Sequence, residues 1–256
     1  IRDVLGARGL GDVYKRQGMD RVMGIYRGAV IELETRKLYY DRILRVMTHE
    51  MRNSITPVIS LAQDYSGCPD KYDPEMLAET MGVIGAQAES IRKFLDSYYS
   101  LTHLPEPRRQ TVDAGSFIRR IRTLVALEEK RRGFKDEVCR YSVPLGMDLY
   151  IDEDLLTQAC MNIIRNALDA VAGFADADVS VIISSSEGIP FVAFSDNGCG
   201  ISEAVRENLF QPFFTTKTGG SGIGLSLSRQ IARLHGGDIT VSSGHPRGTV
   251  VTMSLG

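Results

Sequence analysis

The sequence has 256 residues, of which 43% are hydrophobic and 24% charged, and its formal net charge is −2. This length and this apolar content leave room for about two domains and a sizeable core. Because the two signs of charge are nearly balanced and interspersed, the composition argues against a nucleic-acid-binding surface.

Cysteine usage and hydropathy indicate a protein of the reducing cytoplasm. The four cysteines lack the spacing of a metal site or a disulfide framework, so we expect reduced thiols at Cys68, Cys139, Cys160 and Cys199. No apolar run approaches the roughly 18 residues of a membrane span, and no signal sequence is evident. Any membrane attachment is therefore expected only through a region upstream of this chain.

The chain begins with a segment that fits no regular pattern. Residues 1–18 show neither a helical nor a strand period, and the run Asp12-Val-Tyr-Lys-Arg-Gln17 resembles translated sequencing-adapter sequence. We expect this segment to be non-native or disordered. From about Met19 a helical pattern builds, and residues 19–39 are predicted to form a signalling helix or linker that descends from a sensor region.

Residues 40–104 carry two apolar runs with alternating spacings of four and three, which is the rhythm of a helical-bundle seam. A turn-rich segment at 66–74 joins the two predicted helices into a hairpin. One copy cannot bury both stripes, so we expect a homodimer in which two hairpins form a four-helix bundle. The seam residues are Tyr40, Leu44, Met47, Met51, Ser54, Val58 and Leu61, followed by Leu77, Met81, Ile84, Ala88, Ile91, Leu95 and Tyr98.

The first of these helices contains a histidine that lies away from its apolar seam. His49 lies two residues from both Met47 and Met51, which is roughly 200° around the helix from each. It should point to water, with Glu50 beside it and Asn53 one turn further on the same face. An exposed histidine alone is usually only a surface residue, so its meaning depends on the rest of the chain.

Two prolines in residues 104–109 stop the second helix and predict an extended hinge. Residues 110–256 then alternate between strand and helix patterns, which predicts an α/β sandwich with one mixed sheet covered by helices on one face. Asp113 or Ser116 could cap the first helix. The predicted strands lie near 109–112, 137–143, 148–151, 179–185, 191–195, 238–243 and 249–255.

Three motifs in this second half together predict an ATP site. Asn162, Asn166 and Asp169 share one face of a predicted helix, where the amide oxygen of Asn166 could ligate Mg²⁺ and the other groups could contact phosphate. Asn162 could also be a solvated helix residue, and Asp169 could only cap or orient.

The other two motifs are rich in glycine. A buried strand ends at Asp196, whose carboxylate could accept a hydrogen bond from the adenine amine, and Gly198 and Gly200 follow it. The run Gly220-Ser-Gly222-Ile-Gly224-Leu225 opens a helix over 223–234, so its amides and helix dipole could face a polyphosphate. Lys217, just before this run, could pair with the γ-phosphate or be an ordinary loop lysine.

These motifs resemble the N box and the two glycine boxes of the GHKL ATPase superfamily, over residues from about 110 to 256. The run Phe210-Gln-Pro-Phe-Phe-Thr-Thr-Lys217 resembles the phenylalanine box and lid of its histidine kinase branch. In the first half, Thr48-His-Glu-Met-Arg-Asn-Ser-Ile-Thr-Pro57 resembles the phosphoacceptor box of NtrY-type nitrogen-regulation kinases, with Ser54 in place of the first proline.

The resemblance implies a sensor histidine kinase of α+β class, with a dimeric helical bundle at 40–104 and a Bergerat ATP-binding fold at 110–256. It implies that His49 is phosphorylated from Mg²⁺-ATP and passes the phosphoryl group to an aspartate of a response regulator receiver domain. Glu50 would act as general base towards Nδ1. Asn53 would position the water of a phosphatase reaction, and a lid over 201–219 would close on the phosphates.

Several other interpretations were weighed. We expect structural roles for the other three histidines. His103 lies at a helix end, His235 precedes a Gly-Gly turn and His245 precedes a proline. A regulator-docking scaffold without kinase turnover would lack a key His, Asn or glycine, and none is missing. A GHKL ATPase that drives conformational work would lack the hairpin with its His-Glu-x-x-Asn run.

Overall fold

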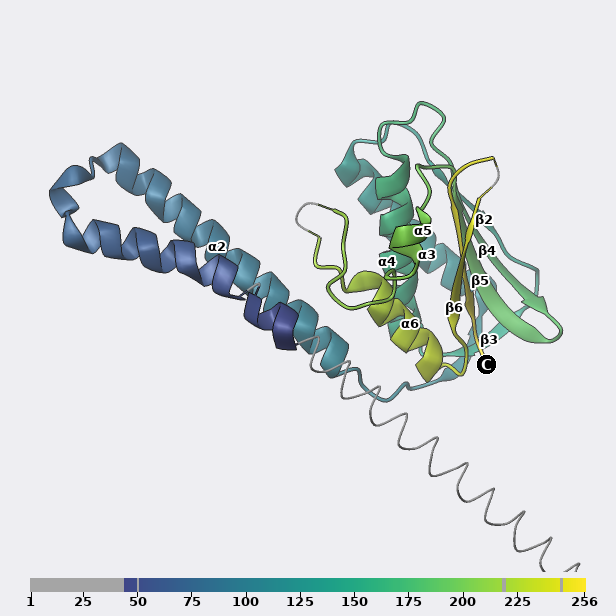
Figure 1. Ribbon diagram of the computed structural model, residues 1–256. Helices are drawn as coiled ribbons and strands as arrows, with labels where there is room; N and C mark the ends of the chain where they lie inside the picture. The colour runs from purple at the N-terminus through teal and green to yellow at the C-terminus, as the bar shows by residue number, and fades with distance from the viewer. Residues whose placement is uncertain (1–43, 50, 218–219, 245) are drawn as a thin grey trace, which may run out of the picture. The chain divides into compact units, whose positions relative to one another are not determined.

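The computed structural model describes residues 44–49, 51–217, 220–244 and 246–256 (Figure 1). Contacts divide the chain into two compact units, Ile1–Ala88 and Glu89–Gly256, and the division falls inside helix α2 (Pro74–Thr102). The predicted segments 1–18 and 19–39, together with Glu50 and His245, lie outside the described residues.

The first part of the described chain is a helical hairpin. Helix covers 44–49 and 51–67, a 3₁₀ turn η1 covers Pro69–Lys71, and α2 follows. Asp64 stabilises the turn, because its Oδ2 accepts hydrogen bonds from Lys71 Nζ at 3.2 Å and from Tyr72 Oη at 2.5 Å. Asp73 Oδ1 then accepts from the Met76 amide at 2.8 Å, at the start of α2. The hairpin and its turn are as the sequence predicts.

Five strands of the second unit form one mixed sheet in the order β2-β4-β5-β7-β6. Only β2 and β4 are parallel within it, and the other neighbours are antiparallel. The bounds are β2 Cys139–Ser142, β4 Val179–Ser186, β5 Ile189–Asp196, β6 Ile239–Ser243 and β7 Thr249–Ser254.

Three helices cover one face of this sheet, and the core lies between the two layers (Figure 1). They are α3 Ala114–Arg132, α4 Glu153–Val171 and α6 Gly224–Leu234, and a short α5, Glu203–Arg206, lies in the predicted lid. Asp113 is the N-cap of α3, since its carboxylate accepts from the Ser116 amide, and Asp152 caps α4 through the Leu155 amide.

The prediction of a single sheet was wrong. The strands β1 (Gln110–Asp113) and β3 (Asp148–Ile151) pair only with each other, as a separate antiparallel ribbon. Each strand is four residues long. Gln110 pairs with Ile151 at one end of the ribbon, and Asp113 pairs with Asp148 at the other. Apolar alternation identifies a strand but not its partner, so the sequence could locate these two strands without assigning them to a sheet.

His235 has the structural role that the sequence predicts. Its side chain is fully buried, with Nε2 accepting a hydrogen bond from the Asp152 amide at 3.0 Å and Nδ1 lying 2.8 Å from the Ile231 carbonyl. The Nδ1 atom therefore carries the proton and donates to that carbonyl. Burial lowers the pKa of this imidazole, so the neutral form links the end of α6 to the start of α4.

Candidate active site

Helix α4 brings the predicted N-box side chains to one face. Its opposite face is apolar and fully buried, including Leu156, Ile164 and Leu168. Asn162, Asn166 and Asp169 are spaced by four and three residues, so they line up away from that core. The burial of the apolar face therefore fixes the direction in which the polar side chains project.

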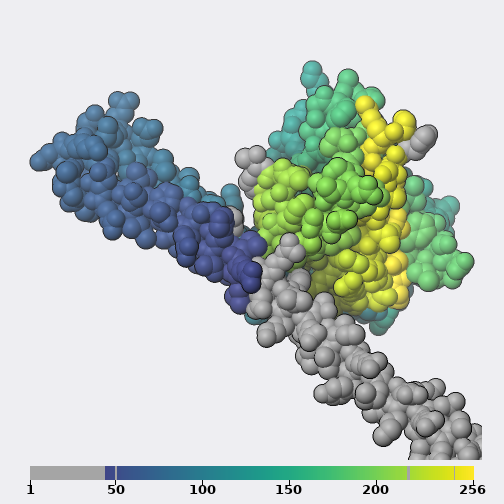
Figure 2. All heavy atoms as spheres, in the orientation of Figure 1, coloured from purple at the N-terminus to yellow at the C-terminus, as the bar shows by residue number. Residues whose placement is uncertain are grey.

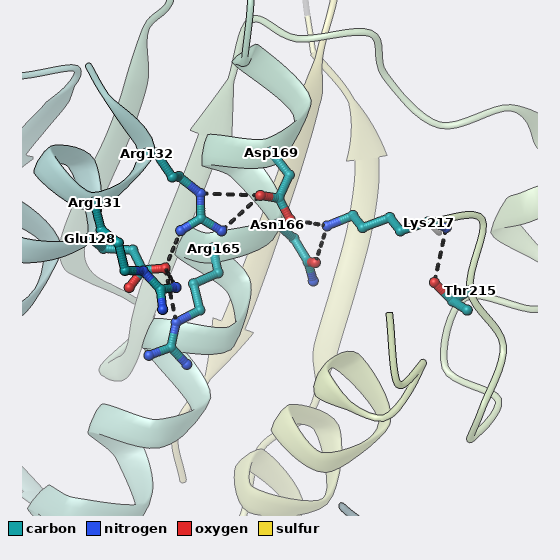
Figure 3. Close-up of polar contacts among 8 residues, drawn as sticks. All are labelled: Glu128, Arg131, Arg132, Arg165, Asn166, Asp169, Thr215 and Lys217. Atoms are coloured by element: carbon teal, nitrogen blue, oxygen red, sulfur yellow. Dashed lines mark hydrogen bonds and ion pairs between the residues drawn. The ribbon is translucent and has the colours of Figure 1, made fainter. Parts of the chain in front are cut away.

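Lys217 contacts two of these side chains. Its Nζ lies 2.7 Å from Asn166 Oδ1 and 2.6 Å from Asp169 Oδ2, and the Lys217 amide donates to Thr215 Oγ1 at 3.0 Å (Figure 3). The sequence leaves two interpretations of this lysine open, a contact to the γ-phosphate or an ordinary loop position. In the structure its ammonium binds the predicted magnesium ligand and the neighbouring carboxylate.

Asp169 is also bound from its other side by α3. Arg132 Nη2 lies 2.7 Å from Asp169 Oδ1, while Lys217 takes Oδ2 (Figure 3). Partial burial raises the pKa of the Asp169 carboxyl, but the hydrogen bonds from Lys217 and Arg132 outweigh this effect and leave its pKa below the usual range. Asp169 is therefore held as an ion at neutral pH.

Arg132 is itself fixed by a buried carboxylate. Glu128, one turn earlier on α3, forms ion pairs with Arg132, with Arg131 at 2.5 Å and with Arg165 at 3.6 Å. Burial raises the pKa of Glu128, yet the Arg131 and Arg132 contacts lower it further, so the net shift is downward. The contacts in Figure 3 thus form one network that runs from Glu128 through Arg132 and Asp169 to Lys217 and Asn166.

Asp196 lies at the end of β5 on the helix-covered face of the sheet. Val192, Phe194 and Asp196 alternate as buried residues, which is the strand period. Asp196 Oδ1 accepts from the Gly198 amide at 2.9 Å and from the Thr249 amide at 3.2 Å. Burial raises its pKa despite these bonds. A carboxylate offers about four acceptor positions, so these donors orient Asp196 and leave capacity for an adenine amine.

Two of the motif glycines are required by contacts within the protein. A Cβ on Gly198 would lie 2.4 Å from the Ala170 carbonyl oxygen of α4, and one on Gly222 would lie 2.4 Å from the Phe213 carbonyl carbon. Gly222 also has a φ of 66°. Gly198 and Gly222 therefore allow close backbone packing around the site.

The remaining residues of the motifs lie around the start of α6. Asn162 Nδ2 donates to the Gly224 carbonyl at 3.4 Å, so Asn162 joins α4 to the last glycine motif. Gly224 is the first residue of α6 and Leu225 follows it. Gly200 and Gly220 lie on either side of the segment 201–217, which precedes α6 in the chain. This segment forms part of the surface of the second unit and is drawn as light green spheres in Figure 2.

In the hairpin, His49 is exposed, as its helical position predicts. Its Nδ1 lies 3.1 Å from Asn53 Nδ2, one turn further along the helix. A cavity of about 360 Å³ adjoins it and is lined by Leu44, Arg45, Thr48, His49 and Arg52. Asn53 thus lies beside the Nδ1 atom of the imidazole, and Glu50, the predicted base, is outside the described residues.

The oxygen atoms at α4 fit a cation. Asn166 Oδ1 and Asp169 Oδ2 both lie within 2.7 Å of one ammonium group, which shows that they converge on a single position of positive charge. Hard oxygen donors of this kind suit Mg²⁺, which takes one or two protein ligands and completes its shell with phosphate and water. Among the described residues, no cluster of three or more His, Cys, Asp or Glu side chains offers an alternative metal site.

Sequence reasoning missed Arg132, Glu128 and the Thr249 amide. Arg132 is 37 residues from Asp169 along the chain, and Thr249 is 53 residues from Asp196. Both contacts join parts of the chain that are far apart in sequence, so no local pattern could have identified these pairings. The lysine and two arginines in the last turn of α3 are instead a pattern expected for the negative end of a helix dipole.

Residues 151–256 match the family model described as histidine kinase-, DNA gyrase B- and HSP90-like ATPase. The chain is 29% identical over 211 residues to the signal transduction histidine-protein kinase AtoS of Escherichia coli, covering 82% of this chain and 33% of the relative. It is 26% identical over 222 residues to the nitrogen regulation protein NtrY of Azorhizobium caulinodans, covering 83% of this chain and 28% of the relative. The chain thus spans about a third or less of the length of these relatives.

Solved structures agree with the fold. The histidine kinase ThkA, in complex with the response regulator protein TrrA, matches with a TM-score of 0.62 and 19% identity, over 84% of this chain and 60% of that one. Full-length ShkA in complex with AMPPNP matches with a TM-score of 0.57 and 19% identity, over 83% of this chain and 45% of that one. The α+β architecture is therefore that of histidine kinases.

Proposed function

Because residues 151–256 form a domain of the histidine kinase-, DNA gyrase B- and HSP90-like ATPase family, and the chain is related to sensor histidine kinases, we propose that it is the kinase portion of such a sensor. The observation that carries this proposal is the presence, on one chain, of an ATPase-type domain and an exposed helical histidine, His49, with Asn53 bonded to it.

The ATP site that we propose lies beside α4 and α6. Asp196 would accept the adenine amine, because its carboxylate is buried and held by backbone amides. Asn166 would hold Mg²⁺, with Asn162 and the Gly220, Gly222 and Gly224 backbone near the phosphates. When bound, Mg²⁺ would neutralise charge on the phosphate oxygens. Gly198 and Gly200 would shape the adenine side of the site.

In the proposed reaction, the Nε2 lone pair of His49 attacks the γ-phosphorus of ATP. The P–N bond forms as the bond from phosphorus to the bridging oxygen breaks, and ADP leaves with that electron pair. The imidazole then has to lose its Nδ1 proton, for which Glu50 is the proposed base. Asn53 Nδ2 lies 3.1 Å from Nδ1 and can only donate to it, so the reacting tautomer, which carries its proton on Nδ1, requires this contact to be released.

The phosphoryl group would then pass from His49 to an aspartate of a response regulator receiver domain, which restores the neutral imidazole. We also propose a phosphatase reaction in which Asn53 positions the attacking water, and a homodimer built on the hairpin. No helix among the described residues has the length and apolarity to span a membrane. We place this portion on the cytoplasmic side, with any membrane attachment supplied by other parts of the protein.

The test is transfer of label from γ-labelled ATP with Mg²⁺ to the chain, followed by acid and base treatment. We expect acid-labile, base-stable label on the wild type, as for a phosphoramidate. His49→Gln should abolish it by removing the acceptor, and Asn166→Ala should abolish it by removing the magnesium ligand. His103→Gln is the matched control, since His103 is an exposed histidine directly after α2 that stacks on Tyr99.

Other outcomes would select the rival functions. Nucleotide binding without label on the wild type would favour a regulator-docking scaffold or phosphatase. Steady release of inorganic phosphate that His49→Gln leaves unchanged would favour an ATPase whose energy drives conformational work. Label that survives His49→Gln would exclude His49 as the acceptor.

A further inference from the structure

The oxygen atoms of Asn166 and Asp169 already bind a positive charge, which is the ammonium of Lys217 (Figure 3). We propose that Lys217 and the divalent cation compete for these two oxygens, with the lysine bound when nucleotide is absent. This inference rests on the proposed function, because it assigns Asp169 and Lys217 to the same cation site as Asn166.

The distances make the two occupants mutually exclusive. Lys217 Nζ lies 2.7 Å from Asn166 Oδ1 and 2.6 Å from Asp169 Oδ2. A magnesium ion sits about 2.0–2.1 Å from its oxygen ligands. A metal bound to both oxygens would lie close to the position of Nζ, because both oxygens are within 2.7 Å of that atom, and like charges repel there. The lysine must therefore leave when the metal binds.

Asp169 can remain in place after Lys217 leaves. Its other oxygen, Oδ1, is bound by Arg132 Nη2 at 2.7 Å, and Arg132 is anchored by the buried Glu128. The side chain of Arg132 is only 20% exposed. The carboxylate thus keeps its orientation without the lysine, and Oδ2 stays directed towards Asn166. Arg132 is accordingly a positioning residue for the cation site.

Lys217 is suited to a reversible contact. Its side chain is 41% exposed, and an ion pair with this exposure contributes little free energy because water screens it. A divalent ion that arrives with nucleotide phosphates brings more charge and more ligands, so it can displace the ammonium. Once displaced, Lys217 becomes available for the γ-phosphate contact, which is one of the two roles that the sequence allows. The lysine would therefore bind one partner before nucleotide arrives and another afterwards.

The first test measures Mn²⁺ binding by electron paramagnetic resonance on the full chain without nucleotide. If Lys217 competes, Lys217→Gln should bind Mn²⁺ more tightly than the wild type, by about fivefold or more, which is the lower end of common coupling between two ligands. Lys135→Gln removes an exposed lysine of the same unit and should match the wild type. Adding Asp169→Asn to Lys217→Gln should remove the gain.

The second test follows the lysine itself. Trypsin should cleave slowly after Lys217 in the wild type, because an ammonium group bound to Asn166 and Asp169 cannot enter the specificity pocket of the protease. The cleavage rate then follows the fraction of molecules in which the Lys217 side chain is released. Mg²⁺ should speed the release of the peptide that ends at Lys217. Cleavage after Lys135 in the same digest is the internal control. Asp169→Asn should give the fast rate without added metal.

The results separate this inference from the proposed function. Equal Mn²⁺ affinity in the wild type and Lys217→Gln, or cleavage after Lys217 that ignores Mg²⁺, would overturn the competition. Binding of a fluorescent ATP analogue in the presence of EDTA reports the nucleotide site without any metal. If the analogue binds while the Mn²⁺ result is negative, only the inference fails. If no variant binds the analogue, the proposed kinase function fails.

Discussion

Asp196 combines burial with a defined set of hydrogen bonds, which makes it a sharp test of nucleotide recognition. Asp196→Asn keeps an oxygen that can accept from the Gly198 and Thr249 amides, so the fold should survive. It replaces the other oxygen with a donor, which cannot accept from an adenine amine. We expect nucleotide affinity to fall by about 1.5–3 kcal/mol, the usual contribution of a hydrogen bond to a charged group.

The measurement is titration of a fluorescent ATP analogue into the wild type and Asp196→Asn, with thermal unfolding to confirm the fold. Asp136→Asn removes an exposed carboxylate of the same unit and serves as control. Since burial raises the pKa of Asp196, affinity in the wild type should also fall as pH drops through that raised pKa. Unchanged affinity in Asp196→Asn would remove Asp196 from the adenine site.

How well single residues could be predicted depended on how local their partners are. Asn162, Asn166 and Asp169 share a helix face that spacing alone defines, and the exposure of His49 follows from its distance to Met47 and Met51 along the helix. The sequence offered Lys217 a phosphate contact or an ordinary loop position, but not its contacts to α4, which cross 51 and 48 residues of chain. Pairings over such separations are set by the tertiary fold, which no local pattern records.

At the scale of elements, alternation and spacing were sufficient for strands and helices but not for their assembly. The predicted strand at 148–151 matches β3, and the predicted helix at 223–234 differs from α6 by one residue at its start. The separation of β1 and β3 from the main sheet was missed. The strands β1, β2 and β3 are equally short, with four residues each. Their length does not show which strand pairs with which, so the pairing is determined by the tertiary fold.

His235 joins two of these elements, and its titration should affect the stability of the second unit. Its folded pKa lies below the unfolded value of 6.5, so the unfolded chain binds more protons once the pH falls below about 6.5. Stability should therefore decrease from pH 7.5 to pH 5.5. His235→Asn loses the buried contacts to Asp152 and Ile231, and we expect a cost of about 1–3 kcal/mol at pH 7.5.

Urea unfolding at the two pH values measures both effects. The difference between the wild type and His235→Asn should shrink at pH 5.5, because the asparagine does not titrate. His103→Asn changes an exposed histidine directly after α2 and should cost little at either pH. A difference that stays constant from pH 7.5 to pH 5.5 would show that proton binding at His235 does not contribute to acid sensitivity.

At the scale of the whole molecule, the hairpin exposes apolar side chains that a second copy could cover. Met81 and Leu95 belong to the predicted seam of α2, and they are 47% and 42% exposed in one chain. Burying each such side chain stabilises an assembly by about 1.5–3 kcal/mol. Since a dimer has two copies of each, replacing both with glutamate should remove most of the association energy. We expect sedimentation equilibrium to show a dimer for the wild type and a monomer for the double variant Met81→Glu, Leu95→Glu.

The specificity of that result rests on a matched change outside the hairpin. Leu127 is 65% exposed on α3, so Leu127→Glu introduces a glutamate at an exposed apolar position outside the hairpin. It should leave the wild-type dimer intact. Dissociation by Leu127→Glu as well would mean that α3 contributes to association. A double variant that remains dimeric would contradict a bundle built on the α2 seam, because four buried carboxylates without partners would be too costly to keep there.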